Sequence, residues 1–505
     1  MRTTLEGRRF DLLVIGGGVT GAGVARDAAM RGLQVALVEK DDFASGTSSK
    51  SSRLVHGGIR YLEHRQFGMV RESVRERETL LRIAPHLVHP LEFTWPVYRG
   101  ARISRLKLRV ALGVYDSLGG RFWSRSHRML SRDGVLAHEP ALGRDGLKGG
   151  AVYQDAATDD SRLTLANALS AEAFGAITLN HTEALRPVSR DRSEWIVDVR
   201  DKLTGMESEV RATVIVNATG PWRLNLERRW PQRTAQRRGS KGVHIAVPSE
   251  RVGNRAAVTM ISPEDGRVMF VLPGTRRTII GTTDTWTEEV PDDVRASESD
   301  IAYLLKSANA CFPDARLSET DVISAWAGIR PLADWEASSN PSEVSREHRI
   351  ARNGAGMITV SGGKLTTYRA MAAEIVDAVE RELGRKPSHC KTAETVLAGG
   401  EREVEIASLI RADATLGNLI VPGLPYTMAE LRYAVQNEMA VNLSDLLIRR
   451  TRVAHETPDH GAAALESVGS LVAPLRKWSA DRLRQEMGAY DVEVERIFGV
   501  APGAV

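Results

Sequence analysis

The stretch that begins at Phe10 constrains the fold more than any other part of the sequence. An apolar run at 10–15 has the length of a strand, and it leads into Gly-Gly-Gly-Val-Thr-Gly at 16–21. A helical pattern and a second strand-like run at 34–38 follow, and this run ends at Glu39. Strand, glycine turn, helix, strand and acid in this order, within about 30 residues, predict a dinucleotide-binding unit built on a parallel sheet.

Each glycine of the turn has a physical role in this interpretation. Gly16 allows the tight turn after the strand, Gly18 lets a pyrophosphate approach the backbone, and Gly21 lets the helix pack closely. The helix N-terminus offers N–H groups and a partial positive charge to phosphates. Glu39 would bind ribose hydroxyls and repel a 2′-phosphate, which favours FAD or NAD over NADP. The alternative is a glycine-rich turn of an ordinary parallel sheet, and the flanking elements argue against it.

A second polar loop follows the acid and favours FAD over NAD. Residues 44–63 read ASGTSSKSSRLVHGGIRYLE. Hydroxyls and backbone amides suit the wrapping of a pyrophosphate from a second side, and paired glycines let the chain pass under a flavin ring. An NAD-binding domain has no need of such a loop. A solvated serine-rich loop is the alternative that composition alone suggests.

Together these residues resemble the FAD-dependent (aerobic-type) glycerol-3-phosphate dehydrogenase family, within the glycine/D-amino-acid-oxidase-like flavoproteins. The similarity continues in six later segments: NATGPW at 217–222, GTTD at 281–284, GIRPL at 328–332, SGGKLTTYR at 361–369, ELRYAV at 430–435 and RRTR at 449–452. We expect an α/β (α+β overall) chain in which a Rossmann-like FAD-binding domain is interleaved with a mainly β substrate cap domain, followed by a C-terminal helical domain. The expected ranges are 1–75, 150–224 and 346–384 for the first, 76–149 and 225–345 for the second, and 390–505 for the third.

The resemblance and the turn chemistry predict the contacts with FAD. These residues are Gly16, Gly18, Gly21, Glu39, Lys40, Thr47, Ser48, Ser51, Ser52, Arg53, His56, Gly57, Gly58, Ala218, Gly220, Gly363, Lys364, Leu365 and Thr366. The helix that opens after Lys364 would direct its N-terminus at the flavin, where negative charge develops on reduction. No metal site is expected, because the acids near residue 160 fit no ligand loop and suit a helix start, with Asp159 or Asp160 as the N-cap.

A phosphorylated alcohol as substrate would need cations and a proton acceptor. Guanidinium groups suit a phosphate dianion. By resemblance the substrate-binding residues are Arg60, Tyr61, Arg330, Arg346 and Lys364, and the catalytic residues are His56, Arg330 and Lys364. His56 lies before two glycines beside the expected flavin position, and imidazole suits proton transfer near neutral pH. His244, in a predicted cap strand, is the rival proton acceptor.

The resemblance implies oxidation of sn-glycerol 3-phosphate to dihydroxyacetone phosphate, with hydride transfer to the flavin and electrons passed to a membrane quinone. A glycerophosphate oxidase that uses oxygen, and an amine oxidase on the same fold, are alternatives. A flavin-binding regulator that acts on nucleic acid without turnover is a third. That alternative is disfavoured, because aromatic residues are only 5% of the 505 and the net charge of +4 is dispersed.

The sequence also predicts where the protein works. No apolar run approaches the roughly 18 residues that span a bilayer, residues 1–9 lack a signal-peptide core, and Cys311 and Cys390 have no ligand-like spacing. We expect a cytoplasmic protein, and the resemblance allows a homodimer. Residues 98–118 interleave cations with Ile103, Leu106 and Val110. This pattern suits either a solvated helix with its apolar stripe on the core or a peripheral contact with the cytoplasmic face of the cell membrane.

Overall fold

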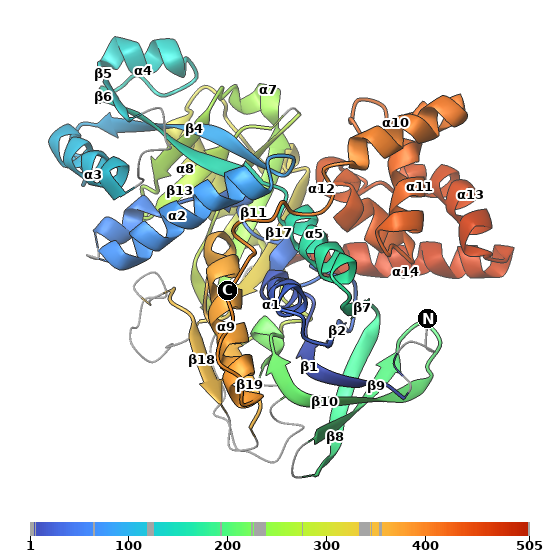
Figure 1. Cartoon of the computed structure of the whole chain (residues 1–505). Coiled ribbons are helices and arrows are strands. Elements are labelled where there is room, and N and C mark those ends of the chain that lie inside the picture. The colour runs from blue at the N-terminus through green and yellow to red at the C-terminus, as the bar shows by residue number, and fades with distance from the viewer. Residues whose placement is uncertain are drawn as a thin grey trace.

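The computed structural model describes residue 5 and residues 7–63, 66–118, 126–191, 194–223, 226, 239–274, 276–332, 344, 346–352 and 356–502. Figure 1 shows three parts: a lower sheet with β1 and β10, an upper sheet with β4, β6 and β11, and a group of orange and red helices at the right. Two sheets with associated helices and a separate helical part confirm the predicted fold class. The boundaries of the three domains stay predictions.

The lower sheet is built around the predicted glycine-turn unit. Its order is β18-β19-β10-β1-β2-β7, and β1 pairs in parallel with both β2 and β10. The strands of this path are β1 (Arg9–Ile15), β2 (Val35–Val38), β7 (Ile177–Leu179), β10 (Glu207–Asn217), β18 (Arg349–Arg352) and β19 (Ile358–Ser361). β8 (Thr182–Asp191) and β9 (Glu194–Asp201) extend it as an antiparallel pair beside β10. The strands predicted at 10–15 and 34–38 are confirmed.

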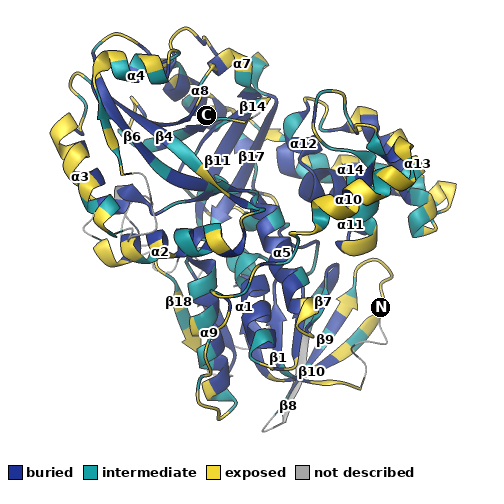
Figure 2. Ribbon diagram, turned by 45° about the horizontal axis from the view of Figure 1, so that its top comes forward, coloured by how far each residue is buried: buried dark blue, intermediate teal, exposed yellow. Residues whose placement is uncertain are grey.

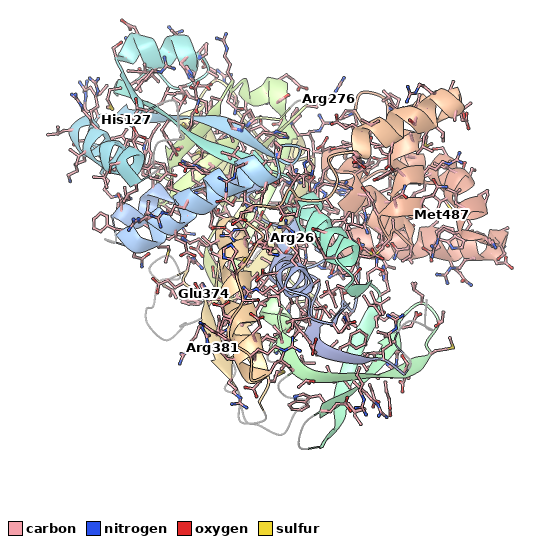
Figure 3. All side chains as sticks on the ribbon, viewed as in Figure 1. Arg26, His127, Arg276, Glu374, Arg381 and Met487 are labelled. Carbon is pink, nitrogen blue, oxygen red and sulfur yellow. The ribbon has the colours of Figure 1, made fainter. Side chains whose placement is uncertain are left out.

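Three helices cover one face of this sheet. Apolar residues of α1 (Val19–Met30), α5 (Asp160–Ala173) and α9 (Tyr368–Glu382) share one buried cluster with the strands. The side chain of Asp159 accepts a hydrogen bond from the Arg162 backbone N–H at 2.8 Å, so Asp159 is the N-cap of α5. Arg26, labelled near the centre of Figure 3, is buried and links α1 to α5 through Ser170 at 3.0 Å.

The upper sheet is mainly antiparallel and contains the predicted cap strands. Its order in the described residues is β15-β11-β14-β13-β12-β4-β6-β3, with β17 also paired to β11. The main strands are β4 (Val88–Tyr98), β6 (Leu147–Thr158), β11 (Gly239–Pro248), β12 (Ala257–Ile261), β13 (Val268–Leu272), β14 (Arg277–Gly281) and β17 (Ser324–Arg330). Short strands complete it: β3 (Leu54–Val55), β5 (Arg128–Leu130) and β15 (Thr285–Thr287). Helix α8 (Glu298–Cys311) packs on it and begins with a capping box formed by Ser297 and Asp300.

The C-terminal part is helical, as predicted. It contains α10 (Arg402–Ala412), α11 (Met428–Asn437), α12 (Val453–Glu456), α13 (Leu465–Arg476) and α14 (Ala480–Phe498). A π-helical turn, η10 (Asp445–Arg450), lies among them. The buried cluster of these helices includes Ala246 and Trp326 of the upper sheet, so this part is docked by a shared apolar core.

Two further helices pack against the upper sheet, α2 (Phe67–Ile83) and α3 (Arg105–Leu118). The buried face of α3 consists of Leu108, Leu112 and Tyr115, whereas Leu106 is 72% and Val110 60% exposed. The predicted stripe therefore divides: its first member precedes the helix and is buried, and the other two point to solvent. Figure 2 shows the exposed outer side of α3 in yellow. Among the described residues, no helix combines the length and the apolarity that a bilayer crossing requires.

We predict that Gly21→Ala lowers the free energy of unfolding by about 1–3 kcal/mol or more, because an added Cβ would lie 1.9 Å from the Gly16 carbonyl oxygen. Gly113→Ala on α3 is the matched control, since its Cβ would meet nothing within 4 Å. The control should gain about 0.5–1 kcal/mol. Denaturant unfolding followed by circular dichroism compares the two. Equal stability of Gly21→Ala and wild type would contradict the close approach of α1.

Candidate active site

A cavity of about 520 Å³ lies between the two sheets. Its walls come from the carboxyl ends of β1, β2 and β10, from the serine-rich loop, and from β11 and β17 of the upper sheet. Among the described residues, those lining the cavity end at Thr366, so the C-terminal helices contribute none. Ligands of open parallel sheets bind at the carboxyl ends of the strands, and the cavity has that position.

The glycine turn forms the first wall. Gly16 has a φ of +111°, and a Cβ there would lie 2.7 Å from the Ala218 carbonyl oxygen. Gly18 has only the Ser48 hydroxyl nearby, at 3.2 Å from a Cβ position, so its backbone stays accessible from the cavity. The predicted contacts Ala218 and Gly220 line this end as well. Gly21 does not line the cavity, because its role is the packing of α1 against the turn.

Glu39 and Lys40 continue this wall at the end of β2. One carboxylate oxygen of Glu39 accepts the Gly17 N–H at 2.6 Å, and the other accepts the Asp41 N–H at 2.9 Å. Burial raises the pKa of Glu39, and these two donors oppose that shift. An acid fixed in this place next to a glycine turn is suited to the ribose hydroxyls of an adenosine.

The serine-rich loop forms the second wall, and the predicted residues Thr47, Ser48, Ser51 and Ser52 all line the cavity. The Thr47 hydroxyl donates to the Ile329 carbonyl at 2.7 Å, and Ser51 donates to Asp160 at 2.7 Å. The Ser48 hydroxyl accepts the Val19 N–H of α1 at 2.9 Å. The hydroxyls therefore connect the loop to β17 of the upper sheet and to helices α1 and α5, as well as facing the cavity.

Arg53 departs from the predicted set. The structure places its guanidinium 5.6 Å from the ring centroid of Trp326, outside the lining of the cavity. Its backbone has a φ of +55°, while its neighbour Ser52 points to the cavity and lies 2.9 Å from the Nε2 of His244. Ser52 therefore faces the cavity, and Arg53 does not.

The His-Gly-Gly segment lies at the opposite end, next to Thr366. The Thr366 hydroxyl accepts the His56 N–H at 3.1 Å, and the His56 ring packs edge-on against Phe270 at 6.0 Å. His56 and Gly58 line the cavity, whereas Gly57 lies behind it. The Gly57 N–H donates to Tyr115 at 2.8 Å, and a Cβ there would lie 2.4 Å from the Tyr115 hydroxyl oxygen. Gly57 is thus required by packing beneath the loop.

Three cations line the same cavity as this segment. Arg330, Arg346 and Lys364 line the cavity together with Tyr61, although they come from distant parts of the chain. The ammonium group of Lys364 lies 3.9 Å from the ring centroid of Tyr61. The predicted contacts Gly363, Leu365 and Thr366 continue the lining from Lys364. The side chain of Arg60 lies outside the described residues.

A buried carboxylate joins two of these cations, and the sequence reasoning missed it. Asp284 is 4% exposed and accepts from Arg330 at 3.2 Å and from Arg346 at 3.0 Å. Ser240 also donates to it. The signal was present, because Asp284 ends a Gly-Thr-Thr-Asp segment that resembles the family. What the sequence could not show is that its partners follow much later in the chain.

Gly242 of the upper sheet makes room for the Arg330 side chain, and its partner Gly328 makes room for Lys50. Gly242 on β11 pairs with Gly328 on β17, and both line the cavity. A Cβ on Gly242 would lie 2.4 Å from a guanidinium nitrogen of Arg330. The guanidinium therefore lies over a bare patch of sheet, where Thr282 accepts from it at 3.0 Å.

His244, the rival proton acceptor, also lines the cavity. It is 2% exposed and stacks on Trp326, with 5.7 Å between ring centroids. Burial, helped by the charges of Arg330 and Arg53, lowers the pKa of His244 to about 3. The ring is neutral at physiological pH and is a weak base. His56 remains the predicted proton acceptor.

The sequence matches two family models, and they cover both parts of the chain. Residues 11–369 match the FAD dependent oxidoreductase family, and residues 399–483 match the C-terminal domain of alpha-glycerophosphate oxidase. The chain belongs to the FAD-dependent oxidoreductase family. The family predicted from the sequence is thereby confirmed, and with it the cofactor FAD.

Members of this family include relatives that resemble the chain over most of its length. The glycerol-3-phosphate dehydrogenase of Mycobacterium leprae is 37% identical over 524 residues, which cover 96% of this chain and 88% of that protein. The aerobic glycerol-3-phosphate dehydrogenase of Staphylococcus haemolyticus is 36% identical and covers 89% and 88%. The X-ray structure of the glycerol-3-phosphate dehydrogenase from Bacillus halodurans complexed with FAD is 31% identical, with a TM-score of 0.78 and coverage of 98% and 96%.

The lining suits the family's cofactor on its own chemistry. Gly16, Gly18 and the N-terminus of α1 offer backbone to a pyrophosphate, and Glu39 offers a carboxylate to a ribose. Gly58, with a φ of +73°, lets the chain turn closely beside His56. FAD would therefore lie with its adenosine toward Glu39 and its flavin toward His56 and Lys364.

The low pKa of His244 makes folding stability depend on pH. Its ordinary pKa of about 6.5 lies above the folded value of about 3, so below pH 6.5 the unfolded chain binds a proton that the folded chain does not. The contribution of neutral, buried His244 to the free energy of unfolding is complete above pH 6.5 and falls as the pH drops toward 3. Between pH 7 and 5 wild type should lose about 2 kcal/mol that His244→Gln does not lose. Denaturant unfolding at both pH values measures this, with exposed His89→Gln as control, and parallel pH profiles would contradict it.

Proposed function

We propose that this chain oxidises sn-glycerol 3-phosphate to dihydroxyacetone phosphate and passes the electrons to a membrane quinone. When bound, FAD supplies the hydride acceptor. The observation that carries the proposal is that Arg330, Arg346 and Lys364 line the same cavity as His56, with Arg330 and Arg346 joined by Asp284. Such a group is suited to a phosphate dianion. The relatives named glycerol-3-phosphate dehydrogenase support the same substrate.

The residues have separate roles in this proposal. Arg330 and Arg346 bind the phosphate, and Asp284 keeps their guanidinium groups in place. Lys364 binds substrate and stabilises negative charge near the flavin, while Tyr61 packs against its ammonium group. Arg60 completes the predicted substrate site. His56 takes the hydroxyl proton as carbon 2 gives up its hydride, and the surrounding cations favour the developing alkoxide.

The electron acceptor separates two candidate functions. The match of the C-terminal residues to alpha-glycerophosphate oxidase favours oxygen, and the relatives named dehydrogenases favour another acceptor. We favour a membrane quinone because α3 has cations beside two exposed apolar residues, Leu106 and Val110. An apolar stripe flanked by Lys107 and Arg109 is suited to an anionic bilayer surface. Stoichiometric hydrogen peroxide during turnover, with no reduction of a quinone analogue, would identify an oxidase instead.

For the phosphate, we predict that Arg330→Lys weakens binding of glycerol 3-phosphate and that Arg330→Ala weakens it more. Lysine keeps the charge but cannot contact Asp284 and Thr282 with one planar group. Loss of a buried charged partner costs about 2–5 kcal/mol, or roughly one and a half to more than three decades in affinity. Stopped-flow reduction of the flavin against substrate concentration gives the affinity.

The phosphate prediction has two controls. Glycerol lacks the phosphate, so its very slow oxidation should change little in Arg330→Ala. Arg276→Ala removes an exposed arginine in the bend just before β14, labelled at the top of Figure 3, which does not line the cavity, and should leave the affinity unchanged. Wild-type affinity for glycerol 3-phosphate in Arg330→Ala would exclude Arg330 as the phosphate ligand.

For the membrane, we predict that Lys107→Glu with Arg109→Glu moves the protein from anionic vesicles to solution. Each cation near such a surface contributes about 1 kcal/mol. Leu106→Ser with Val110→Ser should weaken binding in neutral vesicles also, because it removes apolar insertion. Arg381→Glu with Lys386→Glu makes the same charge change on exposed residues of the lower part and should keep vesicle binding. Co-sedimentation measures all three, and equal binding by every variant would place α3 away from lipid.

A further inference from the structure

The C-terminal helices contact the wall that contains Glu39 without lining the cavity. Asp42, three residues after Glu39, is fully buried and accepts four hydrogen bonds. Arg450 donates two of them, at 2.6 and 2.9 Å, Arg449 donates one at 2.7 Å, and Asn180 donates one at 3.0 Å. Two arginines of the π-helical turn η10 thus compensate one carboxylate of the cofactor wall.

The same cluster could be taken for a metal site. Asp42, His181 and Asp445 each have a ligand atom within 4.8 Å of the others, and all three are buried. Both oxygens of Asp42 already face guanidinium N–H groups, and Asp445 accepts from Arg449 at 2.8 Å and lies 3.1 Å from the His181 ring. Two arginines beside these acids repel a cation, so the cluster is a buried ion network.

The network reaches Glu39 through short backbone links. The His181 N–H donates to the Asp41 carbonyl at 2.6 Å, and the Thr182 N–H donates to the Glu39 carbonyl at 2.7 Å. The Asp41 N–H in turn donates to the Glu39 carboxylate at 2.9 Å. A displacement of Asp42 would therefore move the carboxylate that faces the cavity, together with Thr182 on the same wall.

A second contact reaches the same wall at Lys40, the residue after Glu39. Arg496 on α14 donates to the Asp292 carbonyl at 3.2 Å. The Asp292 carboxylate accepts from Lys40 at 2.6 Å and from the indole of Trp222 at 2.8 Å, and all three of these residues line the cavity. The C-terminal helices thus contact the wall of Glu39 and Lys40 at two places, through Asp42 and through Asp292.

We propose that Arg449, Arg450 and Arg496 are positioning residues for the adenosine half of FAD, and that holding this half is a function of the C-terminal helical part. They act through Asp42 and Asp292 and touch no ligand themselves. Without Arg450, the buried carboxylate of Asp42 would lose two of its four hydrogen-bond donors. Because a buried charge with too few donors is costly, the chain from Glu39 to Asp42 would shift so that water reaches the carboxylate. This inference concerns the cofactor and is independent of the identity of the substrate.

The test compares two buried arginine pairs that join the same parts of the chain. Arg450→Gln removes the fork on Asp42, together with the two bonds that Arg450 donates to the Glu438 carbonyl at 3.0 and 2.7 Å, and leaves Arg449. Arg162→Gln is the matched control, because Arg162 on α5 forms a fork with Glu438 at 2.6 Å for both bonds and leaves Arg402 on that acid. FAD dissociation from each holoprotein is followed by flavin fluorescence. Arg450→Gln should release FAD about tenfold faster or more, whereas Arg162→Gln should stay within about twofold of wild type.

A second measurement distinguishes positioning from general loss of structure. ADP and riboflavin, which resemble the two halves of FAD, each compete with FAD for the apoprotein. Arg450→Gln should weaken ADP by about the same factor as FAD and leave riboflavin unchanged, and Arg450→Lys should recover part of the loss. Arg496→Gln should show the same pattern if Arg450→Gln fails to fold. Equal dissociation rates in Arg450→Gln and Arg162→Gln, or equal weakening of ADP and riboflavin, would overturn the proposal. Because no step measures turnover, a wrong substrate assignment would leave this result unaffected.

Discussion

The close approach of α1 to the end of β1 is the constraint on which the rest of the cofactor end depends. It requires Gly21, where a Cβ would lie 1.9 Å from the Gly16 carbonyl oxygen. Because the helix begins this near the strands, the Val19 N–H reaches Ser48 and the Gly17 N–H reaches Glu39. The serine-rich loop and the acid are thus both positioned by one glycine contact. This explains why a short stretch of sequence specifies most of the dinucleotide-binding geometry.

Charge compensation is the second principle of the structure. Asp284 pairs with Arg330 and Arg346, and Asp42 pairs with Arg449 and Arg450. In the Asp42 cluster a second acid, Asp445, forms an ion pair with Arg449. The two acids and the two arginines there carry equal and opposite charges. Asp284 instead fixes two guanidinium groups that line the cavity. Cations held in place before a ligand binds are what an anionic substrate needs.

The sequence predicted well what local chemistry determines. The glycine turn, Glu39 and the Asp159 cap depend on neighbours along the chain, and their elements were predicted close to the observed bounds. Gly57 could not be interpreted in this way, because the hydroxyl of Tyr115 on α3 decides its role. The capping box at Ser297 is a local signal for α8. It was missed because this region was predicted to be mainly β.

Tertiary contacts account for the remaining differences. The apolar pattern of α3 cannot show which residues meet the core, because Leu108 and Leu112 satisfy helical spacing as well as Leu106 and Val110 do. Only the packing of α3 on the upper sheet distinguishes the two sets. Asp284 is similar, since a carboxylate after a turn reveals nothing of the arginines that reach it from later in the chain.

The cross-strand register of β11 and β17 shows how one sheet face serves both the cavity and the docking of the C-terminal helices. His244 pairs with Trp326, Gly242 with Gly328, and Ser240 with Arg330. Alternate residues of a strand share a face, so these three pairs form a single row. Trp326, next to His455 at 5.2 Å between ring centroids, closes the row toward the C-terminal helices. The glycine pair leaves the middle of the row without side chains, and Arg330 lies over that gap. A side chain at Gly242 would meet the Arg330 guanidinium, and one at Gly328 would meet Lys50, and both of these residues line the cavity. The cavity therefore depends on this pairing as much as on the charges around it.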